Sequence, residues 1–162
     1  EDGDAGRAGP AGPAGPAGPA GSQGPKGDSG TANVIYSSWL DVTYSTNADS
    51  ATWIAEIPAA KLTPELLSTG EIKVYLNLGE ANDPFIVPLP YFDGGFIINV
   101  RMYEQTIGLM SNANLSTYTD EDTGAKAQQV RYVLIPGGTT ARTAGVDWNN
   151  YQQVKKYLNL KD

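Results

Sequence analysis

Glycine occupies every third position through the first thirty residues, and this spacing constrains the fold more than any other feature of the chain. Three polyproline-type chains pack into a collagen triple helix only when the residue at the crowded axis has no side chain. A flexible Gly/Pro/Ala-rich linker has no reason to keep that phase. The period therefore predicts a homotrimer with a triple-helical stalk. The axis positions are Gly3, Gly6, Gly9, Gly12, Gly15, Gly18, Gly21, Gly24, Gly27 and Gly30.

The residues between these glycines indicate a short rod of modest stability. All five prolines of the repeat directly follow a glycine, and none stands in the third position of a triplet. Hydroxyproline at that position is therefore excluded, which favours a bacterial or phage collagen over an animal one. At the rise of a polyproline helix, the repeat gives a rod of about 90 Å. We interpret Lys26 and Asp28 as an interchain ion pair rather than as part of an adhesion motif.

The composition changes abruptly after residue 30, because every aromatic residue lies beyond that point. We therefore divide the chain into a collagen-like stalk, residues 1–30, and a globular head, residues 31–162, which is long enough to bury a core. The basic residues of the head are scattered, and only Lys155 and Lys156 are adjacent. Nucleic acid is not an expected partner, since a phosphate-binding surface needs clustered Lys and Arg.

The chain contains neither cysteine nor histidine, and this limits its chemistry. Disulfides, thiolate catalysis, Ser-His-Asp catalysis and Cys- or His-ligated metals are excluded, so we expect no cofactor. No apolar run approaches the length of about 20 residues that a membrane span needs. We expect an extracytoplasmic protein, at the cell surface or secreted, attached to a membrane only through an N-terminal anchor outside this sequence.

Alternating polarity predicts that the head is mainly β. In residues 71–78 the apolar side chains fall on every second position, which indicates a half-buried strand. Further strands are predicted at 33–39, 52–57, 85–89, 96–103, 106–110 and 129–135, with Gly, Asn, Asp and Pro clusters between them. Many short strands of this kind predict a β-sandwich. Pro88 and Pro90 cannot donate to a ladder, so segment 85–91 is placed at a sheet edge.

Two helices are predicted, the second of them at the C-terminus. Thr63 can cap a helix that begins at Pro64 and ends before Gly70. In the second, Asp147 is the predicted cap, and the apolar residues that follow recur on one side of the helix. That apolar side must pack against the sheets. The expected head is therefore a β-sandwich with a short C-terminal α-helix that covers one face or edge.

Three segments together resemble the collagen-like repeat surface proteins of Bacteroidota. They are the junction of the triplets with Thr31-Ala-Asn-Val-Ile-Tyr-Ser-Ser-Trp39, the segment Val130-Arg-Tyr-Val-Leu-Ile-Pro-Gly-Gly138, and the terminal segment from Asp147 to Leu158. The resemblance covers nearly the whole chain. It implies a surface lipoprotein with a short collagen stalk and a C-terminal β-rich domain of uncharacterised function. The lipobox cysteine of that family is absent from this sequence.

Asp120 and Asp122 belong to the densest acidic run of the head and are weak candidates for a metal site. The spacing matches a calcium loop poorly, because Gly124, Ala125 and Arg131 stand where a fifth-position ligand, glycine and glutamate are required. We interpret the run as a solvated loop and expect no metal. The glycine pairs in Asp93-Gly94-Gly95 and Pro136-Gly137-Gly138 are interpreted as tight turns.

Aromatic residues near the expected loops are candidates for ligand binding, because Trp and Tyr present flat amphipathic rings. Tyr91 and Tyr118 are the better-exposed candidates for a surface glycan or protein ligand. Phe92 and Tyr103 are also candidates, but each could equally belong to the core or to a subunit interface. The alternation places a further candidate, Tyr132, with Val130 and Leu134 in the core.

No enzymatic activity is expected. A glycosidase needs a pair of carboxylates, and nothing in the pattern selects a pair from Glu56, Glu71 and Glu104, which are placed on predicted strands. The leading hypothesis is a non-enzymatic trimer, structural or adhesive, in which the head nucleates and registers the triple helix, as in phage fibre proteins. The alternatives are a glycan- or protein-binding module on a collagen-like stalk and, less favoured, a polysaccharide-directed enzyme.

Overall fold

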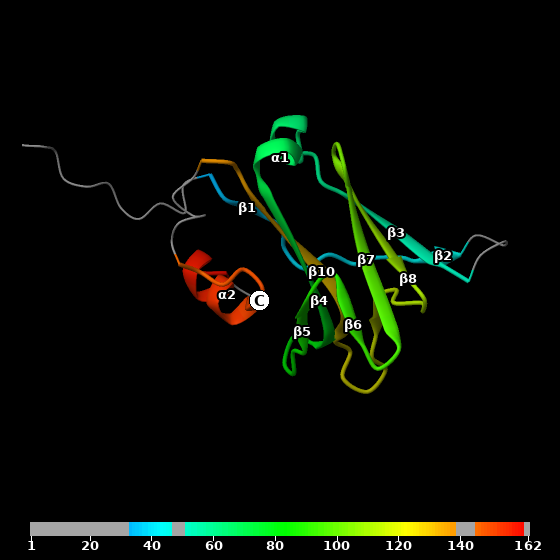
Figure 1. Ribbon diagram of the computed structural model, residues 1–162. Helices are drawn as coiled ribbons and strands as arrows, with labels where there is room; N and C mark the ends of the chain where they lie inside the picture. The colour runs from blue at the N-terminus through cyan, green and yellow to red at the C-terminus, as the bar shows by residue number, and fades with distance from the viewer. Residues whose placement is uncertain (1–32, 47–50, 139–144, 161–162) are drawn as a thin grey trace, which may run out of the picture.

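The computed structural model describes residues 33–46, 51–138 and 145–160. The glycine repeat and the ion pair expected between Lys26 and Asp28 lie outside the described residues. The described residues form two antiparallel sheets and two helices (Figure 1). The head is therefore mainly β with a short C-terminal helix, as the alternation predicts.

Sheet A has the strand order β1-β10-β4-β5, with β9 also paired to β10. Its strands are β1 (Ile35–Tyr36), β4 (Glu71–Glu80), β5 (Ile86–Pro88), β9 (Tyr118–Thr119) and β10 (Lys126–Ile135). Sheet B has the order β2-β3-β8-β7-β6. Its strands are β2 (Ser45–Thr46), β3 (Trp53–Pro58), β6 (Tyr91–Asp93), β7 (Phe96–Tyr103) and β8 (Thr106–Ser111).

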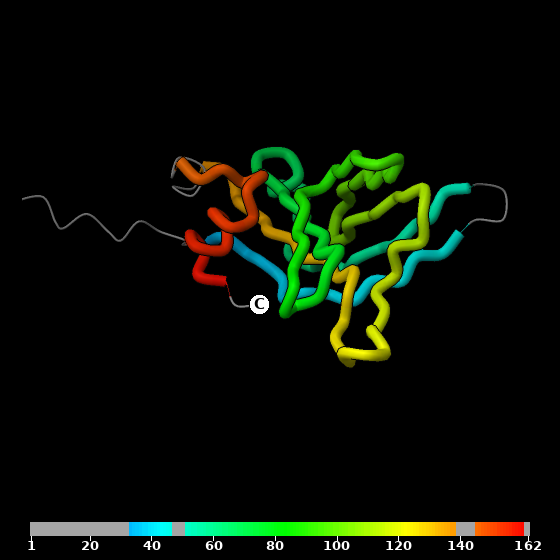
Figure 2. Tube along the Cα trace, turned by 90° about the horizontal axis from the view of Figure 1, so that it is seen from below, coloured from blue at the N-terminus to red at the C-terminus, as the bar shows by residue number. Residues whose placement is uncertain are grey.

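The two sheets pack face to face around one apolar core. Both sheets contribute buried aliphatic side chains to it, because alternate residues of each strand point to the same face. Sheet A contributes Val74, Leu76, Val87, Val130 and Leu134, and sheet B contributes Ala55, Ile57, Ile98, Ile107 and Leu109. The chain passes from sheet A to sheet B between β1 and β2. Figure 2 shows this segment running from the side of the molecule that carries the C-terminal helix toward the opposite side.

Helix α2 (Tyr151–Leu158) covers the outer face of sheet A. The alternation of residues in β4 does not predict that this face is buried. A second apolar cluster joins Tyr75 of β4 and Val133 of β10 to Tyr151, Val154 and other residues of the C-terminal segment. The strand predicted at 71–78 is confirmed as β4, but its predicted half-burial is wrong, since Tyr75 and Asn77 are buried on the face assigned to solvent. The predicted apolar face of the terminal helix is confirmed.

The helix ends differ from one another in how well the sequence predicts them. Helix α1 (Pro64–Thr69) is as expected, with the Thr63 hydroxyl accepting from the Leu66 N–H at 3.3 Å and Gly70 as C-cap. The cap of α2 is Asn150 and not Asp147. Asp147 instead accepts from the N–H of Asn149 at 2.9 Å, so it holds the turn that precedes the helix.

The segment predicted as a strand at 33–39 is a strand only at Ile35–Tyr36. Beyond it the chain still follows β10, but through irregular bonds, because the Ser37 hydroxyl accepts from the Tyr132 N–H and Leu40 forms an isolated bridge with Val130. At the other end of sheet A, β5 is the edge strand. The edge position predicted from Pro88 is therefore confirmed.

Because two tyrosines are buried, we expect the free energy of unfolding to fall at alkaline pH. Burial raises the pKa of both Tyr44, whose hydroxyl has no partner among the described residues, and Tyr75, whose hydroxyl donates to the Trp148 carbonyl at 2.5 Å. Because each folded pKa lies above the unfolded value of about 10, the stabilisation is complete below about pH 10 and is lost as the pH rises toward the folded pKa. The expected slope is about 1.4 kcal/mol per pH unit for each tyrosine.

Urea unfolding at a series of pH values from about 8 to 11 measures this slope. Lysines titrate in the same range, so the comparison is between the wild type and Tyr44→Phe. In the variant, the part of the alkaline fall in unfolding free energy that the two tyrosines cause should be roughly half as large as in the wild type. If the free energy of unfolding depends on pH in the same way in the two proteins, the pKa of Tyr44 is not raised in the folded state.

Candidate functional site

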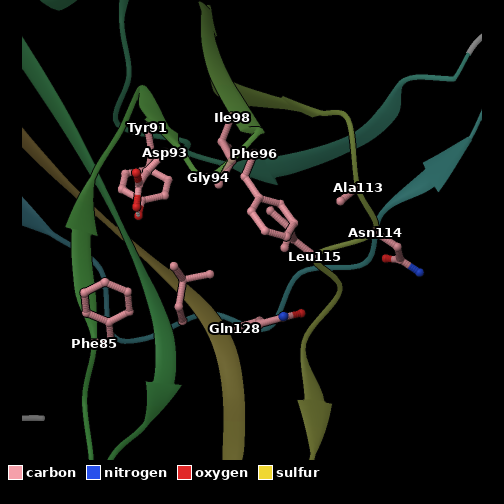
Figure 3. A pocket seen from close by; sticks show the side chains of 11 residues that line it. Phe85, Tyr91, Asp93, Gly94, Phe96, Ile98, Ala113, Asn114, Leu115 and Gln128 are labelled. Atoms are coloured by element: carbon pink, nitrogen blue, oxygen red, sulfur yellow. Dashed lines mark hydrogen bonds between the residues drawn. The ribbon is translucent and has the colours of Figure 1, made fainter.

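A cleft of about 510 Å³ opens at one end of the sandwich, where the β6–β7 hairpin of sheet B approaches β4, β5 and β10 of sheet A (Figure 3). We name it the aromatic cleft, because three of its lining residues carry exposed or half-exposed rings. Its lining residues are Leu78, Phe85, Tyr91, Asp93, Gly94, Phe96, Ile98, Ala113, Asn114, Leu115 and Gln128. Its size falls within the range of small-ligand sites.

The β6–β7 hairpin builds one wall of the cleft. Gly94 and Gly95 form a two-residue turn with φ of 56° and 86°, which glycine adopts without steric cost. The tight turn predicted here is confirmed. Because the register pairs Asp93 with Phe96, the turn places both residues at the mouth, beside Tyr91. The Tyr91 hydroxyl donates to the Asp93 carboxylate at 3.2 Å. Slight desolvation and this bond raise the pKa of Tyr91 above its usual value.

Phe85 forms the opposite part of the cleft, and a buried amide fixes the backbone that carries it. The Asn77 side-chain oxygen accepts from the N–H of Phe85 at 3.0 Å and from the N–H of Gly79 at 3.1 Å. Asn77 is only 4 % exposed, so water does not compete for these bonds. The Phe85 ring itself is 57 % exposed. The result is an exposed aromatic ring on a firmly held support.

Gln128 reaches the cleft through a β-bulge in β10. The register of β10 against β4 shifts between Ala127 and Gln129, and Gln128 lies at φ 60°, a conformation uncommon for residues other than glycine. Its carbonyl accepts from the Thr117 hydroxyl at 2.9 Å. Bulges redirect a side chain and recur beside functional sites. Here the bulge brings an amide to the edge of an otherwise apolar hollow.

The arrangement of the cleft separates a flat apolar interior from a few polar groups at its edge. In Figure 3, Phe85 and Tyr91 lie on one side, Phe96 lies on the other, and Gln128 lies at the lower edge. Ile98 and Leu115 are buried and close the floor. Asn114 points away, and its side-chain oxygen already accepts from the Ser116 N–H. Such a site is suited to binding a ligand with one apolar face and several hydroxyl or amide groups.

The carboxylates offer no glycosidase pair in this cleft. Among the described acidic residues, Asp93 alone lines it. Glu56 is exposed on β3, and Glu71 lies 3.1 Å from the Lys73 ammonium group in an ion pair. Glu104 lies in the β7–β8 turn, so its predicted place on a strand is wrong. A two-carboxylate mechanism needs both groups at the scissile bond.

The two tyrosines proposed for ligand binding are separated by the fold. Tyr91 lines the aromatic cleft, whereas Tyr118 on β9 is 50 % exposed and lies outside its lining. Tyr132 is half-buried and packs against the core, and Tyr103 and Phe92 are exposed on sheet B. Phe85, Phe96 and Gln128 were not predicted as site residues. The neighbouring Pro84 and Gly95 are the turn signals that mark the two phenylalanines as loop-proximal.

The acidic run at Asp120 forms a turn that uses its own carboxylate. One Asp120 oxygen accepts from the N–H groups of Asp122 and Thr123, each at 2.9 Å. These bonds, that from Thr123 foremost, lower the pKa of Asp120. Within the described ranges, no group of three or more His, Cys, Asp or Glu side chains is arranged to hold a metal ion. The run is an exposed turn stabilised from within.

In comparisons with known proteins, no family model, no curated protein and no solved structure matches the chain. Across residues 33–46, 51–138 and 145–160, no helix has the length and apolarity to span a membrane. The function therefore has to be inferred from the aromatic cleft and from the glycine repeat.

Proposed function

We propose that this protein is a non-enzymatic, extracytoplasmic homotrimer whose β-sandwich head binds a neutral glycan, displayed on a collagen-like stalk. The observation that carries the proposal is the aromatic cleft, where three rings surround an apolar floor beside the Tyr91–Asp93 pair and Gln128. The resemblance to Bacteroidota surface proteins supports the location at a cell surface. The glycine period supports the trimer.

The chemistry of the cleft matches a sugar better than other small ligands. A pyranose ring has C–H faces that pack on aromatic rings and hydroxyl groups that both donate and accept. Tyr91 supplies a hydroxyl, Asp93 an acceptor, and Gln128 an amide that does both. The lining contains no Lys or Arg, and Asp93 is acidic. A phosphorylated or otherwise anionic ligand is therefore disfavoured, and a neutral glycan is favoured.

A trimeric stalk would multiply a weak single site. Three heads on one rod meet a repetitive surface at high effective concentration, so avidity can exceed the affinity of one head by about 10²–10⁴. The same geometry supports the structural role of the head, since heads that associate first would bring the three stalk chains into register. Sedimentation of the intact protein tests this part of the proposal, because a monomer at micromolar concentration contradicts it.

Replacing Tyr91 by alanine should lower the affinity for a responding neutral glycan by about tenfold, because a ring and a hydrogen bond are lost from the cleft. Tyr118→Ala is the matched control, since it removes an exposed tyrosine outside the lining. A glycan array with the intact trimer identifies the ligand, and calorimetry measures the two variants. Equal losses in both variants, or an array with no response, would contradict glycan binding at this cleft.

A further inference from the structure

A second hollow, of about 480 Å³, lies between the start of β5 and helix α2. We name it the amide groove, because three of its residues carry side-chain amides. Its lining residues are Pro84, Phe85, Ile86, Asp147, Asn149, Asn150, Tyr151 and Gln152. Phe85 belongs to the lining of both the amide groove and the aromatic cleft. A single exposed ring therefore joins the two hollows at the edge of sheet A.

The amide groove presents donors and acceptors rather than apolar surface. The Asn149 side-chain oxygen accepts from the Lys73 ammonium at 3.2 Å, and the Asn150 oxygen accepts from the Gln153 N–H at 3.3 Å. These bonds fix both side chains with their NH₂ groups available. Gln152 is exposed, and its amide makes no hydrogen bond to the described residues. Uncharged amides of this kind pair with hydroxyl groups, which also donate and accept.

From this arrangement we infer that the ligand is an extended oligosaccharide. It runs from the aromatic cleft, across Phe85, into the amide groove. The inference rests on the proposed glycan binding. Each hollow alone lies within the small-ligand range of about 300–1,000 Å³, so the two together accommodate several sugar units. One sugar packs among the rings of the cleft, the next passes over Phe85, and later units bond to the amides of α2.

An extended peptide fits this edge poorly. Peptides recognised at a sheet edge add a strand through main-chain hydrogen bonds. Along β5, Phe85 accepts from the Leu78 N–H and Leu89 donates to the Val74 carbonyl, so these alternate residues bond inward to β4. The outward position at Pro88 has no N–H to offer. Ile86 is then the one outward-facing residue of β5 with an N–H to donate, so the edge offers a peptide strand a single donor, and a chain of hydroxyl groups is the better match.

Binding should depend on oligosaccharide length. The probes are cello-oligosaccharides and xylo-oligosaccharides from the monosaccharide to the hexasaccharide, titrated by calorimetry into the intact protein. We expect the tetrasaccharide to bind about tenfold or more tightly than the disaccharide. Gln152→Ala should lower the tetrasaccharide affinity to near that of the disaccharide, and Phe85→Ala should weaken both. Lys156→Ala, an exposed change on α2 outside both hollows, should alter neither.

The outcomes separate this inference from the function on which it rests. Binding of equal strength at all lengths, or a length dependence that Gln152→Ala leaves intact, overturns the extended site and leaves glycan binding at the aromatic cleft in place. No response to either oligosaccharide series, together with no response on the glycan array, overturns both.

Discussion

Replacing Val154 by aspartate should lower the free energy of unfolding by about 3–5 kcal/mol. Val154 is 0 % exposed and packs in the apolar cluster between α2 and the outer face of sheet A. A carboxylate there loses its hydration. The cluster consists of apolar and aromatic residues, and the buried Arg131 beside it already donates to the Tyr151 hydroxyl at 2.6 Å. We expect the helix to separate from the sheet before the sandwich itself unfolds.

Urea unfolding followed by tryptophan fluorescence measures this effect, since Trp148 is 7 % exposed in the same cluster. Lys156→Asp is the matched control: it adds the same carboxylate to an exposed position of α2, where it should cost no more than about 1 kcal/mol. Similar losses in the two variants would show that added charge on the helix, and not burial against sheet A, governs the result.

Replacing Asn77 by alanine should destabilise the head by about 2–4 kcal/mol and also weaken ligand binding by more than tenfold. The substitution leaves the N–H groups of Gly79 and Phe85 without their acceptor in a buried setting, and each unsatisfied group costs about 1–3 kcal/mol. The loop between β4 and β5 then loses its fixed path. Phe85 moves with it, so both hollows lose the ring that they share.

Asn99→Ala provides the comparison, because Asn99 is an exposed asparagine on β7 that should change stability by less than about 0.5 kcal/mol. Urea unfolding gives the stability of each variant, and glycan titration at a temperature where both remain folded gives the affinity. Full affinity in a destabilised Asn77→Ala protein would mean that Phe85 keeps its place without the buried amide.

The elements with a clear local pattern were predictable. Strand β7 matches its predicted range, and helix α1 lies between a capping threonine and a terminating glycine, as residues 63–70 predict. Three of the five shortest strands were not predictable. Strands β2, β6 and β9 have two or three residues each, so no period can form within them, and their pairing depends on β3, β7 and β10.

The two faces of β4 show where local patterns stop being sufficient. Glu71 and Lys73 suggest a solvent face, but Tyr75 and Asn77 on that face are buried because a helix some seventy residues later in the chain packs over them. The displaced cap of α2 has a similar cause. Asp147 is a good capping residue by type, yet its carboxylate is used by the turn before the helix, and Asn150 takes the cap.

The candidate site was predictable only in part for a related reason. Tyr91 was identified because it is an aromatic residue beside turn signals, and the fold places it in the cleft. Tyr118 meets the same criterion and lies elsewhere. Phe85, Phe96 and Gln128 come from three separated segments, and the bulge that turns Gln128 toward them has no signature in the sequence. Convergence of this kind is a property of the sheet arrangement and not of any one segment.

The rings of the cleft are carried by the β6–β7 hairpin and by the loop before edge strand β5, whereas the apolar core between the two sheets is carried mainly by the middle strands β4, β8 and β10. Residues such as Phe85 and Phe96 can therefore change without altering the packing that holds the sheets together. Under the proposed function, related copies of this head are expected to diverge in ligand preference while the packing of the two sheets stays constant. The same separation makes the head a scaffold on which new recognition can be selected by varying a few exposed positions.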